Sequence, residues 1–322
     1  MNSMIQTIDL TKKFNDFVAN DHINLDVKER EIKCIVGENG AGKSTTMNIM
    51  TGYLGATEGQ VLIDGHDILK EPEEAKKNIG YLPEIPPLYM EMTVREYLEF
   101  AAELKGIKKD KREPQIEEVI RLAKLRDVEN RLIQNLSKGY KQRVGLAQAV
   151  LGFPEIIILD EPTVGLDPKQ IIEIRELIRK LAKKHTVILS SHILAEVREV
   201  CDYIMIISGG KLVASDTTEN LENMMSGKGQ IEVEAKASRD EMDHIIRRTG
   251  KIKEVKYRTS ASGITTAQII AKGGEDIREE LFLAFSHADV PMLTLNQSKT
   301  TLEEIFLELT QGSGNRMIKE EK

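Results

Sequence analysis

A glycine-rich segment that ends in lysine and serine is the clearest chemical signature in the sequence. It reads Gly37-Glu38-Asn39-Gly40-Ala41-Gly42-Lys43-Ser44 and fits the phosphate-loop pattern G-x-x-x-x-G-K-[ST] at every position. The glycines let the backbone N–H groups from Asn39 to Thr45 turn toward phosphate oxygens. In this pattern Lys43 reaches the β- and γ-phosphates and Ser44 holds magnesium. The segment therefore predicts a site for a nucleoside triphosphate with Mg²⁺.

Two acidic residues, Asp160 and Glu161, follow a continuous apolar run that begins after Glu155. Such a run is typical of a central parallel strand, and open α/β sheets bind their ligands at the carboxyl ends of these strands. Asp160 could hold Mg²⁺ through its water shell, and Glu161 could accept a proton from a water that attacks the γ-phosphate. The alternative is that the two acids merely begin a loop, and the phosphate loop upstream favours the catalytic interpretation.

A second candidate anion site lies at Leu136-Ser-Lys-Gly-Tyr140, before the helix-like residues 141–151. Ser137 fits the N-cap of that helix, which is its structural interpretation. A capping serine together with a closely approaching glycine, Gly139, could also receive a γ-phosphate. Because the chain's own phosphate loop serves its own nucleotide, this second site would take a phosphate held by another molecule.

The elements around these residues indicate an α/β domain. A strand over 32–37 runs into the glycine loop and then into a helix over 44–50, which argues against an accidental glycine-rich turn. Strands and helices then alternate, which favours a mostly parallel core sheet. The strands are expected at 155–160, 185–190 and 203–207, and the helices at 168–184 and 193–200. Between 71 and 135 the sequence has helical periodicity, and the capping box Thr93–Glu96 begins a helix that ends at Gly106, so a helical insertion is expected.

The pattern changes after Gly227, where Ile231, Val233 and Ala235 alternate with charged residues as in a half-exposed strand. The order of elements that follows, βαββαβ, predicts a small ferredoxin-like α+β domain. A last helix is expected to begin with the capping box Thr301–Glu304. The predicted domains are an ATPase-type domain over 1–227 with a helical subdomain at about 84–150, an accessory domain over 228–310 and a flexible tail over 311–322.

Composition and charge exclude several classes of protein. The chain has 45 Lys and Arg against 52 Asp and Glu, a net charge of −7, so no basic face argues for nucleic-acid binding. Apolar runs such as 156–159 and 204–207 are far shorter than the ~20 residues that cross a bilayer, and the N-terminus resembles no secretory signal. A cytoplasmic chain is expected, with Cys34 and Cys201 as buried, reduced thiols.

Taken together, these motifs resemble those of an ABC transporter ATP-binding subunit. The resemblance rests on the phosphate loop, the Leu136–Tyr140 stretch followed by Lys141-Gln-Arg143, the block from Ile156 to Pro168, and Ser190-Ser-His192. These segments have the order and spacing of that family over about residues 4–220. The residues 300–310 also resemble the end of subunits from ABC-2 type exporters.

The resemblance implies a head-to-tail dimer that encloses two ATP molecules. Each ATP would lie between one subunit's phosphate loop and the Ser137–Gly139 segment of the other. In that scheme Glu161 is the general base, His192 contacts the γ-phosphate, and Asp167 lies in the loop that links the two sites. Phe14 falls where the family stacks an aromatic ring on adenine. The alternative for Phe14 is a residue of the hydrophobic core, and the alternative for His192 is a structural histidine.

Two departures from the family pattern are evident. Glu84 stands where the family usually has glutamine, and a carboxylate there can still ligate Mg²⁺ while adding negative charge near the triphosphate. We expect Glu84 to remain a metal ligand. Lys138 and Tyr140 replace glycine and glutamine of the usual LSGGQ, whereas the serine and the second glycine are kept.

The sequence thus predicts a subunit that binds and hydrolyses ATP to energise a membrane transporter, with export as the expected direction. The transmembrane permease would be a separate protein, and the helical insertion would dock on its cytoplasmic helices, so the subunit would lie on the inner face of the cell membrane. A homodimer and a heterodimer are both compatible with the motifs. The alternatives are a soluble ATPase of the same class and a regulatory module in which the C-terminal domain senses a ligand.

Overall fold

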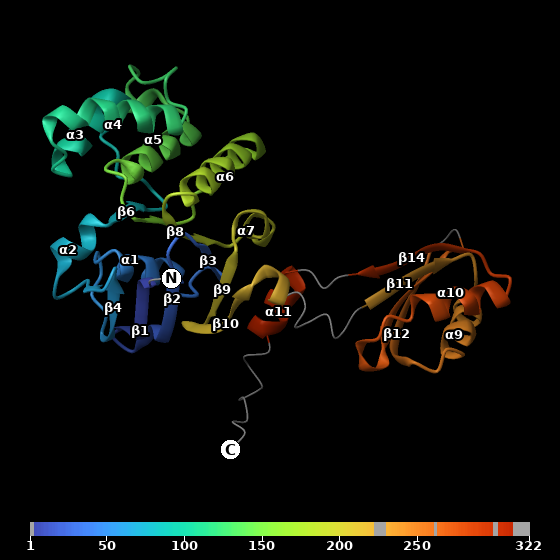
Figure 1. Cartoon of the computed structure of the whole chain (residues 1–322). Coiled ribbons are helices and arrows are strands. Elements are labelled where there is room, and N and C mark those ends of the chain that lie inside the picture. Colours follow the sequence, from blue (N-terminus) through green and yellow to red (C-terminus); the bar gives the residue numbers. More distant parts are fainter. Residues whose placement is uncertain (1–2, 222–229, 261–262, 299–301, 312–322) are drawn as a thin grey trace. The chain divides into compact units, whose positions relative to one another are not determined.

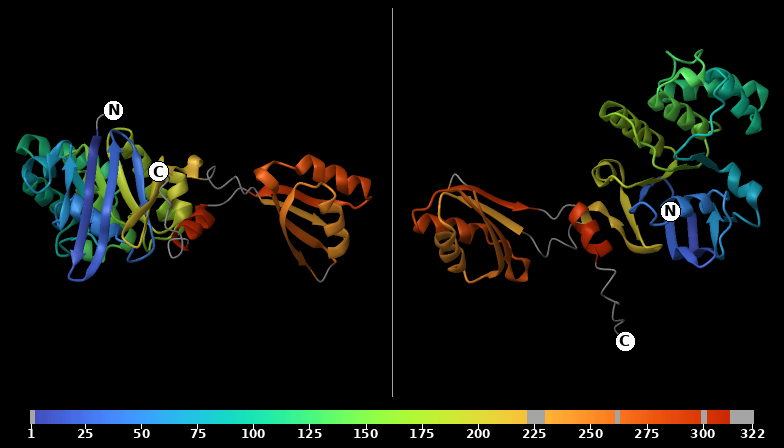
Figure 2. Two further views of the ribbon diagram at one scale, coloured as in Figure 1. Left: turned by 90° about the horizontal axis from the view of Figure 1, so that it is seen from below. Right: turned by 180° about the vertical axis from the view of Figure 1, so that it is seen from behind.

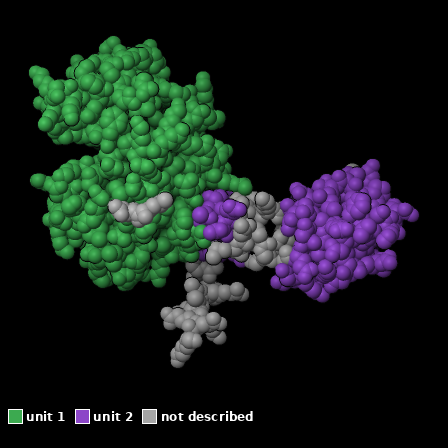
Figure 3. Space-filling view, in the orientation of Figure 1, with its two compact units in different colours: residues 1–216 green, residues 217–322 purple. Residues whose placement is uncertain are grey.

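The computed structural model describes residues 3–221, 230–260, 263–298 and 302–311. The chain divides into two compact units, residues 1–216 and 217–322 (Figure 3). The first unit therefore ends earlier than the boundary at Gly227 that the sequence pattern suggests. It ends at Asp216, one residue before the end of strand β10 (Lys211–Thr217), whereas the sequence pattern changes only at the next strand. Among the described residues, no helix has both the length and the apolar character needed to cross a membrane.

A six-stranded sheet in the first unit has the order β10-β9-β3-β8-β7-β6. The pairs from β9 through β3, β8 and β7 to β6 are parallel, which confirms the predicted core sheet. All residues of β3, β7 and β8 are buried, as expected for apolar strands covered on both faces. The bounds are β3 Ile32–Val36, β6 Ile79–Leu82, β7 Ile156–Leu159, β8 Thr186–Ser191 and β9 Tyr203–Ser208.

A four-stranded antiparallel sheet, with the order β2-β1-β4-β5, accompanies the parallel sheet. Its strands are β1 (Ser3–Phe14), β2 (Phe17–Lys28), β4 (Glu58–Ile63) and β5 (His66–Asp67), and the two long ones stand out in blue in Figure 2. One apolar cluster joins Ile5 and Ile23 of this sheet to Met47 of helix α1 (Lys43–Met50) and to Ile35 and Ile158 of the parallel sheet. The sequence analysis did not predict this sheet. Register shifts along the β1–β2 pair break the strict alternation by which strands are recognised.

The predicted helical insertion is present and gathers α3, α4 and α5 at one end of the first unit (Figure 1). At the start of α3, Thr93 Oγ1 accepts from Glu96 N at 3.2 Å and Glu96 Oε2 accepts from Thr93 N at 2.8 Å, which confirms the capping box. The helices of this unit are α2 Pro72–Lys77, α3 Val94–Leu104, α4 Lys109–Leu122, the short 3₁₀ helix Ile133–Asn135, α5 Lys138–Val150, α6 Pro168–Ala182 and α7 Leu194–Val200.

The second unit contains a four-stranded sheet with the order β12-β13-β11-β14, in which every pair is antiparallel. Its helices pack Met242, Ile245, Leu281 and Phe285 against the buried side of the sheet. The elements run βαββαβ, as the sequence predicts: β11 Gln230–Ala235, α9 Arg239–Arg247, β12 Ile252–Thr259, β13 Thr265–Ala271, the 3₁₀ turn Lys272–Gly274, α10 Arg278–His287 and β14 Met292–Ser298. Helix α11 (Leu302–Gln311) follows. Thr301 of the predicted capping box and tail residues 312–322 lie outside the described residues.

Candidate nucleotide-binding site

The phosphate loop connects the carboxyl end of β3 to the first turn of α1. Gly42 is the N-cap of α1 and has φ 106°, a left-handed conformation that favours glycine. A Cβ atom at Gly42 would lie 2.5 Å from the carbonyl oxygen of Ala19 and 2.8 Å from Nδ2 of Asn20. Asn20, which is buried, donates from Nδ2 to Gly42 O at 3.2 Å and to Thr46 Oγ1 at 2.8 Å. Strand β2 therefore fastens the loop from outside, in a way that only glycine permits.

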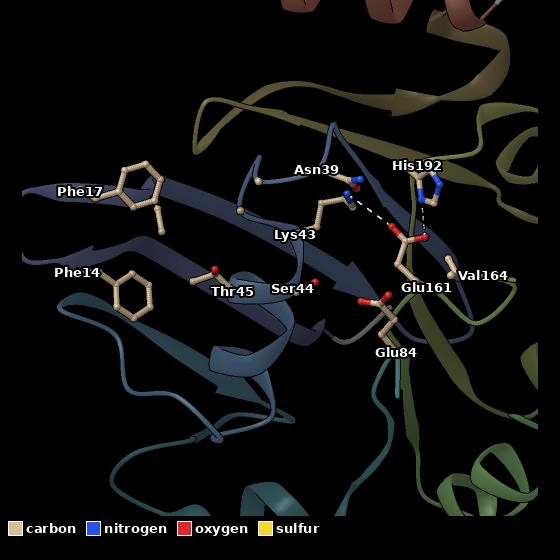
Figure 4. A pocket seen from close by; sticks show the side chains of 13 residues that line it. Phe14, Phe17, Asn39, Lys43, Ser44, Thr45, Glu84, Glu161, Val164 and His192 are labelled. Carbon is tan, nitrogen blue, oxygen red and sulfur yellow. Dashed lines mark hydrogen bonds and ion pairs between the residues drawn. The ribbon is translucent and has the colours of Figure 1, made fainter. Parts of the chain in front are cut away.

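A cavity of about 630 Å³ opens on this loop, a size typical of small-molecule sites. Figure 4 shows Phe14 and Phe17 at one end and Lys43, Glu161 and His192 at the other. The predicted residues that line the cavity come from five separate segments of the chain: Phe14, Asn39, Gly40, Gly42, Lys43, Ser44, Thr45, Glu84, Glu161 and His192. Gly37, Glu38 and Ala41 belong to the same loop but are not among the residues that line the cavity.

Lys43 is held inside the loop by three oxygen atoms. Its Nζ donates to the carbonyl oxygens of Gly37 at 2.9 Å and Glu38 at 3.2 Å, and it lies 3.5 Å from Glu161 Oε1. The side chains of Lys43 and Glu161 are only 6% and 7% exposed. An ammonium group held in this way, with little water around it, is well placed to meet a phosphate oxygen.

The acidic pair at the end of β7 is arranged by one hydroxyl group. Ser190 Oγ donates to Asp160 Oδ1 at 2.5 Å and accepts from Glu161 N at 2.9 Å. Glu161 itself has φ 48°, a left-handed conformation, so the backbone turns sharply after Asp160. The Glu161 carboxylate also meets His192, whose Nδ1 lies 2.9 Å from Oε2. Glu161 and His192 are therefore held at the end of the cavity that Lys43 lines, and the same serine holds the buried Asp160, which is not among the lining residues.

The predicted metal ligands also come together at this end. Ser44 Oγ lies 3.3 Å from Asp160 Oδ1, and Glu84 lines the same cavity. Hydroxyl and carboxylate oxygens are the hard donors that Mg²⁺ prefers, so these side chains fit that ion. Tyr81, just before Glu84, donates from its hydroxyl to Asn48 Oδ1 at 3.1 Å, and burial raises the pKa of Tyr81. This bond ties the segment that carries Glu84 to helix α1.

Two aromatic rings line the other end of the cavity. Phe14 is 46% exposed and has Lys12 Nζ 5.0 Å from its ring centroid, and Phe17 is 63% exposed. The two residues face each other across the β1–β2 hairpin, with Phe14 paired to Phe17. The sequence analysis missed Phe17, although the spacing Phe14-Asn-Asp-Phe17 around a two-residue turn was the available signal.

Ser137, Gly139 and Asp167 do not line this cavity. Ser137 is the N-cap of α5 and accepts from Tyr140 N at 3.4 Å, and Asp167 is the N-cap of α6 and accepts from Gln170 N at 2.9 Å. A Cβ atom at Gly139 would lie 2.4 Å from the Gln170 side chain, so the starts of α5 and α6 adjoin. Helix α5 begins at Lys138, three residues before the predicted start at residue 141, because Ser137 caps the helix and the first helical residue follows its N-cap.

The substituted positions of this segment have partners within the chain. Tyr140 donates from its hydroxyl to Asp127 Oδ2 at 2.5 Å, which ties the start of α5 to the loop after α4. Lys138 extends over Gly165, where an added Cβ atom would lie 2.2 Å from its Nζ. The Ser137–Gly139 segment therefore adjoins Gly165 of the loop that follows Glu161. Ser137, Gly139 and Asp167 lie outside the cavity, whereas Glu161 at the start of that loop lines it.

Comparison with known proteins places these motifs in a family. A family model described as ABC transporter matches residues 20–164. The bacitracin transport ATP-binding protein BcrA of Bacillus licheniformis is 40% identical over 224 residues, which are 69% of this chain and 72% of that protein. The probable multidrug ABC transporter ATP-binding protein YbhF of Escherichia coli is 37% identical over 221 residues, 68% of this chain and 38% of that protein.

A solved structure of similar fold is a dimeric ATP-binding cassette in a post-hydrolysis state with bound ADP and phosphate. It matches with a TM-score of 0.61 and 29% identity, over 66% of this chain and 98% of that chain. The matched family range contains the phosphate loop, the Ser137–Gly139 segment and the two acids at the end of β7. The chain is an ATP-binding and ATP-hydrolysing subunit, and it belongs to the family of ABC transporter ATP-binding proteins.

Proposed function

We propose that this subunit drives the export of a compound across the cell membrane by hydrolysing ATP with Mg²⁺. One observation carries the catalytic part: the Glu161 carboxylate lies between Lys43 Nζ and His192 Nδ1, at 3.5 and 2.9 Å, in a cavity of nucleotide size. Transport of a compound is supported by two relatives, which are named for bacitracin transport and as a probable multidrug transporter. Export is the direction that the resemblance of residues 300–310 to ABC-2 type exporter subunits implies.

Each end of the cavity has a distinct task in this proposal. Phe14 and Phe17 offer exposed ring faces on which adenine stacks. Backbone N–H groups of the loop and Lys43 bind the phosphates, and Ser44, Asp160 and Glu84 would hold Mg²⁺, which offsets the negative charge of the phosphates when bound. Glu161 accepts the proton of the attacking water, and His192 orients Glu161 and donates toward the γ-phosphate.

The active assembly in this proposal is a dimer of ATP-binding subunits. Ser137, Gly139 and Asp167 lie together on a surface outside the cavity, so their phosphate would come from a second subunit. Ser137 and Gly139 contribute the N-terminus of α5, which favours an anion. The dimeric cassette with ADP and phosphate supports this arrangement. The second subunit is either an identical chain or a closely similar one.

A separate permease is the second partner that we propose. A groove of about 490 Å³ lies where α2 meets the helical insertion and the end of α5. Among the described residues, no acidic side chain lines this groove. Five lysines do: Lys76, Lys77, Lys105, Lys108 and Lys111. Burial lowers the pKa of Lys105 to about 8, and its Nζ donates to Leu151 O at 2.6 Å. An acidic cytoplasmic segment of the permease would complement this groove and hold the subunit at the inner face of the membrane.

Substitution of Glu161 tests the catalytic proposal. Glu161→Gln should retain ATP binding but lower phosphate release by about 100-fold or more, because a general base contributes at least that much. ATP should then hold the variant as a dimer, measured by light scattering. Glu155→Gln, at the exposed opposite end of β7, is the matched control and should release phosphate normally. Near-normal release by Glu161→Gln would remove Glu161 from the role of base.

A further inference from the structure

A second hydrogen bond, outside the nucleotide cavity, joins the same two segments that the Glu161–His192 contact joins. Thr163 Oγ1 donates to Glu196 Oε2 at 2.5 Å. Both residues are buried, at 5% and 7% exposure, and neither lines the cavity. Thr163 lies two residues after Glu161, and Glu196 lies four residues after His192 on helix α7. The loop after β7 and the segment after β8 are therefore linked by two contacts. Glu161–His192 lies in the cavity lining, and Thr163–Glu196 is buried outside it.

The charge of Glu196 is met on its other side by Arg175 of helix α6. Arg175 Nη2 lies 3.8 Å from Glu196 Oε1, and Arg175 Nη1 lies 2.6 Å from Oε2 of the exposed Glu199. A buried carboxylate is stable only where hydrogen bonds and an opposite charge surround it. Thr163 and Arg175 supply these from two different elements, so Glu196 has a single favourable position relative to both.

Helix α7 needs such an attachment because it is short and weakly capped. It has seven residues, and its N-cap, Ile193, makes no side-chain cap hydrogen bond. Helices of this length are not stable by themselves and depend on tertiary contacts. Since His192 directly precedes the N-cap of this helix, a shift of α7 would move the His192 ring relative to the Glu161 carboxylate.

We propose that Glu196, held by Thr163 and Arg175, is a positioning residue for ATP hydrolysis. It fixes α7 against the loop after β7 and thereby keeps His192 within hydrogen-bond distance of Glu161. The inference rests on the proposed roles of Glu161 and His192. Because catalysis depends steeply on the placement of the reacting groups, loosening this link should lower turnover without weakening ATP binding.

Isosteric substitution of Thr163 tests the proposal in the full-length protein with ATP and Mg²⁺. Thr163→Val keeps the shape of the side chain and removes the hydroxyl, and we expect kcat to fall by about tenfold while KM changes by less than about twofold. Thr163→Ser restores the hydroxyl and should recover most of kcat. Glu199→Gln is the matched control. It neutralises the exposed carboxylate on α7 that also contacts Arg175, and it should leave kcat unchanged.

A double-mutant cycle separates positioning from a general structural role. If the link acts through His192, then Thr163→Val should not slow His192→Ala any further, so the double variant should hydrolyse ATP like His192→Ala alone. Multiplied losses would overturn the inference, as would a normal kcat in Thr163→Val or in His192→Ala. Thermal unfolding and ATP affinity, measured on each variant, show whether it is folded.

A second substitution covers the case in which Thr163→Val does not fold. Glu196→Gln keeps the size of the side chain and removes the charge that Thr163 and Arg175 meet, so kcat should fall, and again not in the His192→Ala background. A fall that persists in that background contradicts the inference. Glu161→Gln in the same assay tests the proposed function separately. Turnover by Glu161→Gln contradicts the function, whereas normal kcat in Thr163→Val beside an inactive Glu161→Gln contradicts only the positioning role.

Discussion

Two side chains that are distant in the sequence from their partners, Ser190 and Asn20, hold the acidic residues and the phosphate loop of this site in position. The Ser190 hydroxyl donates to Asp160 and accepts from the backbone of Glu161, so one side chain fixes a carboxylate and the peptide that follows it. Asn20 does the same for the phosphate loop, through Gly42 and Thr46. The loop pattern predicts which residues would bind phosphate. Ser190 belongs to the Ser190-Ser-His192 motif, but the hydrogen bonds of Ser190 and Asn20 do not follow from any local pattern.

Glu84 stands where the family usually has glutamine, and its substitution has a clear expected result. If the carboxylate is a Mg²⁺ ligand, Glu84→Gln should raise the Mg²⁺ concentration for half-maximal hydrolysis several-fold, because a neutral amide oxygen binds the ion more weakly. Phosphate release measured over a magnesium titration checks this. Unchanged magnesium dependence and rate would show that Glu84 is not a ligand.

Helices and strands were predicted correctly where the residues that determine them are neighbours in the sequence. The capping box at Thr93 and the cap at Ser137 were predicted from neighbouring residues, and the buried strands β7 and β8 from continuous apolar runs. The β1–β2 pair was missed because its bulges disrupt the alternation of apolar and polar residues. The contacts of Ser190 and Asn20 were not predicted because they depend on which strands become neighbours, which no local pattern encodes.

The Thr93 cap gives an element-scale prediction. Thr93→Ala should lower the free energy of unfolding by about 1 kcal/mol, measured by urea denaturation, and Thr93→Ser should restore most of it. Hydrogen bonds from Thr93 hold the pKa of Glu96 below its ordinary value. The stabilisation by Glu96 is therefore present at neutral pH and is lost as pH falls through that lowered pKa. The difference between wild type and Thr93→Ala should accordingly shrink in acid, and a constant difference would contradict the reciprocal cap.

Among the described residues, each unit has an apolar core of its own. The order βαββαβ of the second unit followed from the sequence, whereas the end of the first unit at Asp216 did not, because β10 carries no change in composition. The position of Ser137, Gly139 and Asp167 away from the cavity was expected from the family resemblance. In the proposed dimer their phosphate would come from a second chain, which one sequence does not specify.

Because each unit has an apolar core of its own, we expect the full-length protein to show two unfolding transitions in calorimetry. ATP with Mg²⁺, added to the Glu161→Gln variant so that it is not consumed, should raise the midpoint of the first unit and leave that of the second nearly unchanged, since a ligand stabilises only the unit that binds it. Scanning calorimetry with and without nucleotide measures this. An equal rise of both transitions would show that the two units unfold together.

The contact between Lys43 and Glu161 has a consequence for how substitutions at either position are interpreted. Both side chains are almost fully buried, 3.5 Å apart, so each compensates the other's charge within the protein. Removal of one leaves the other buried without its counterion, which is commonly more destabilising than removal of both. A loss of activity in Lys43→Ala or Glu161→Gln thus combines a missing catalytic group with an orphaned charge, and the variant that neutralises both residues is the reference that separates them.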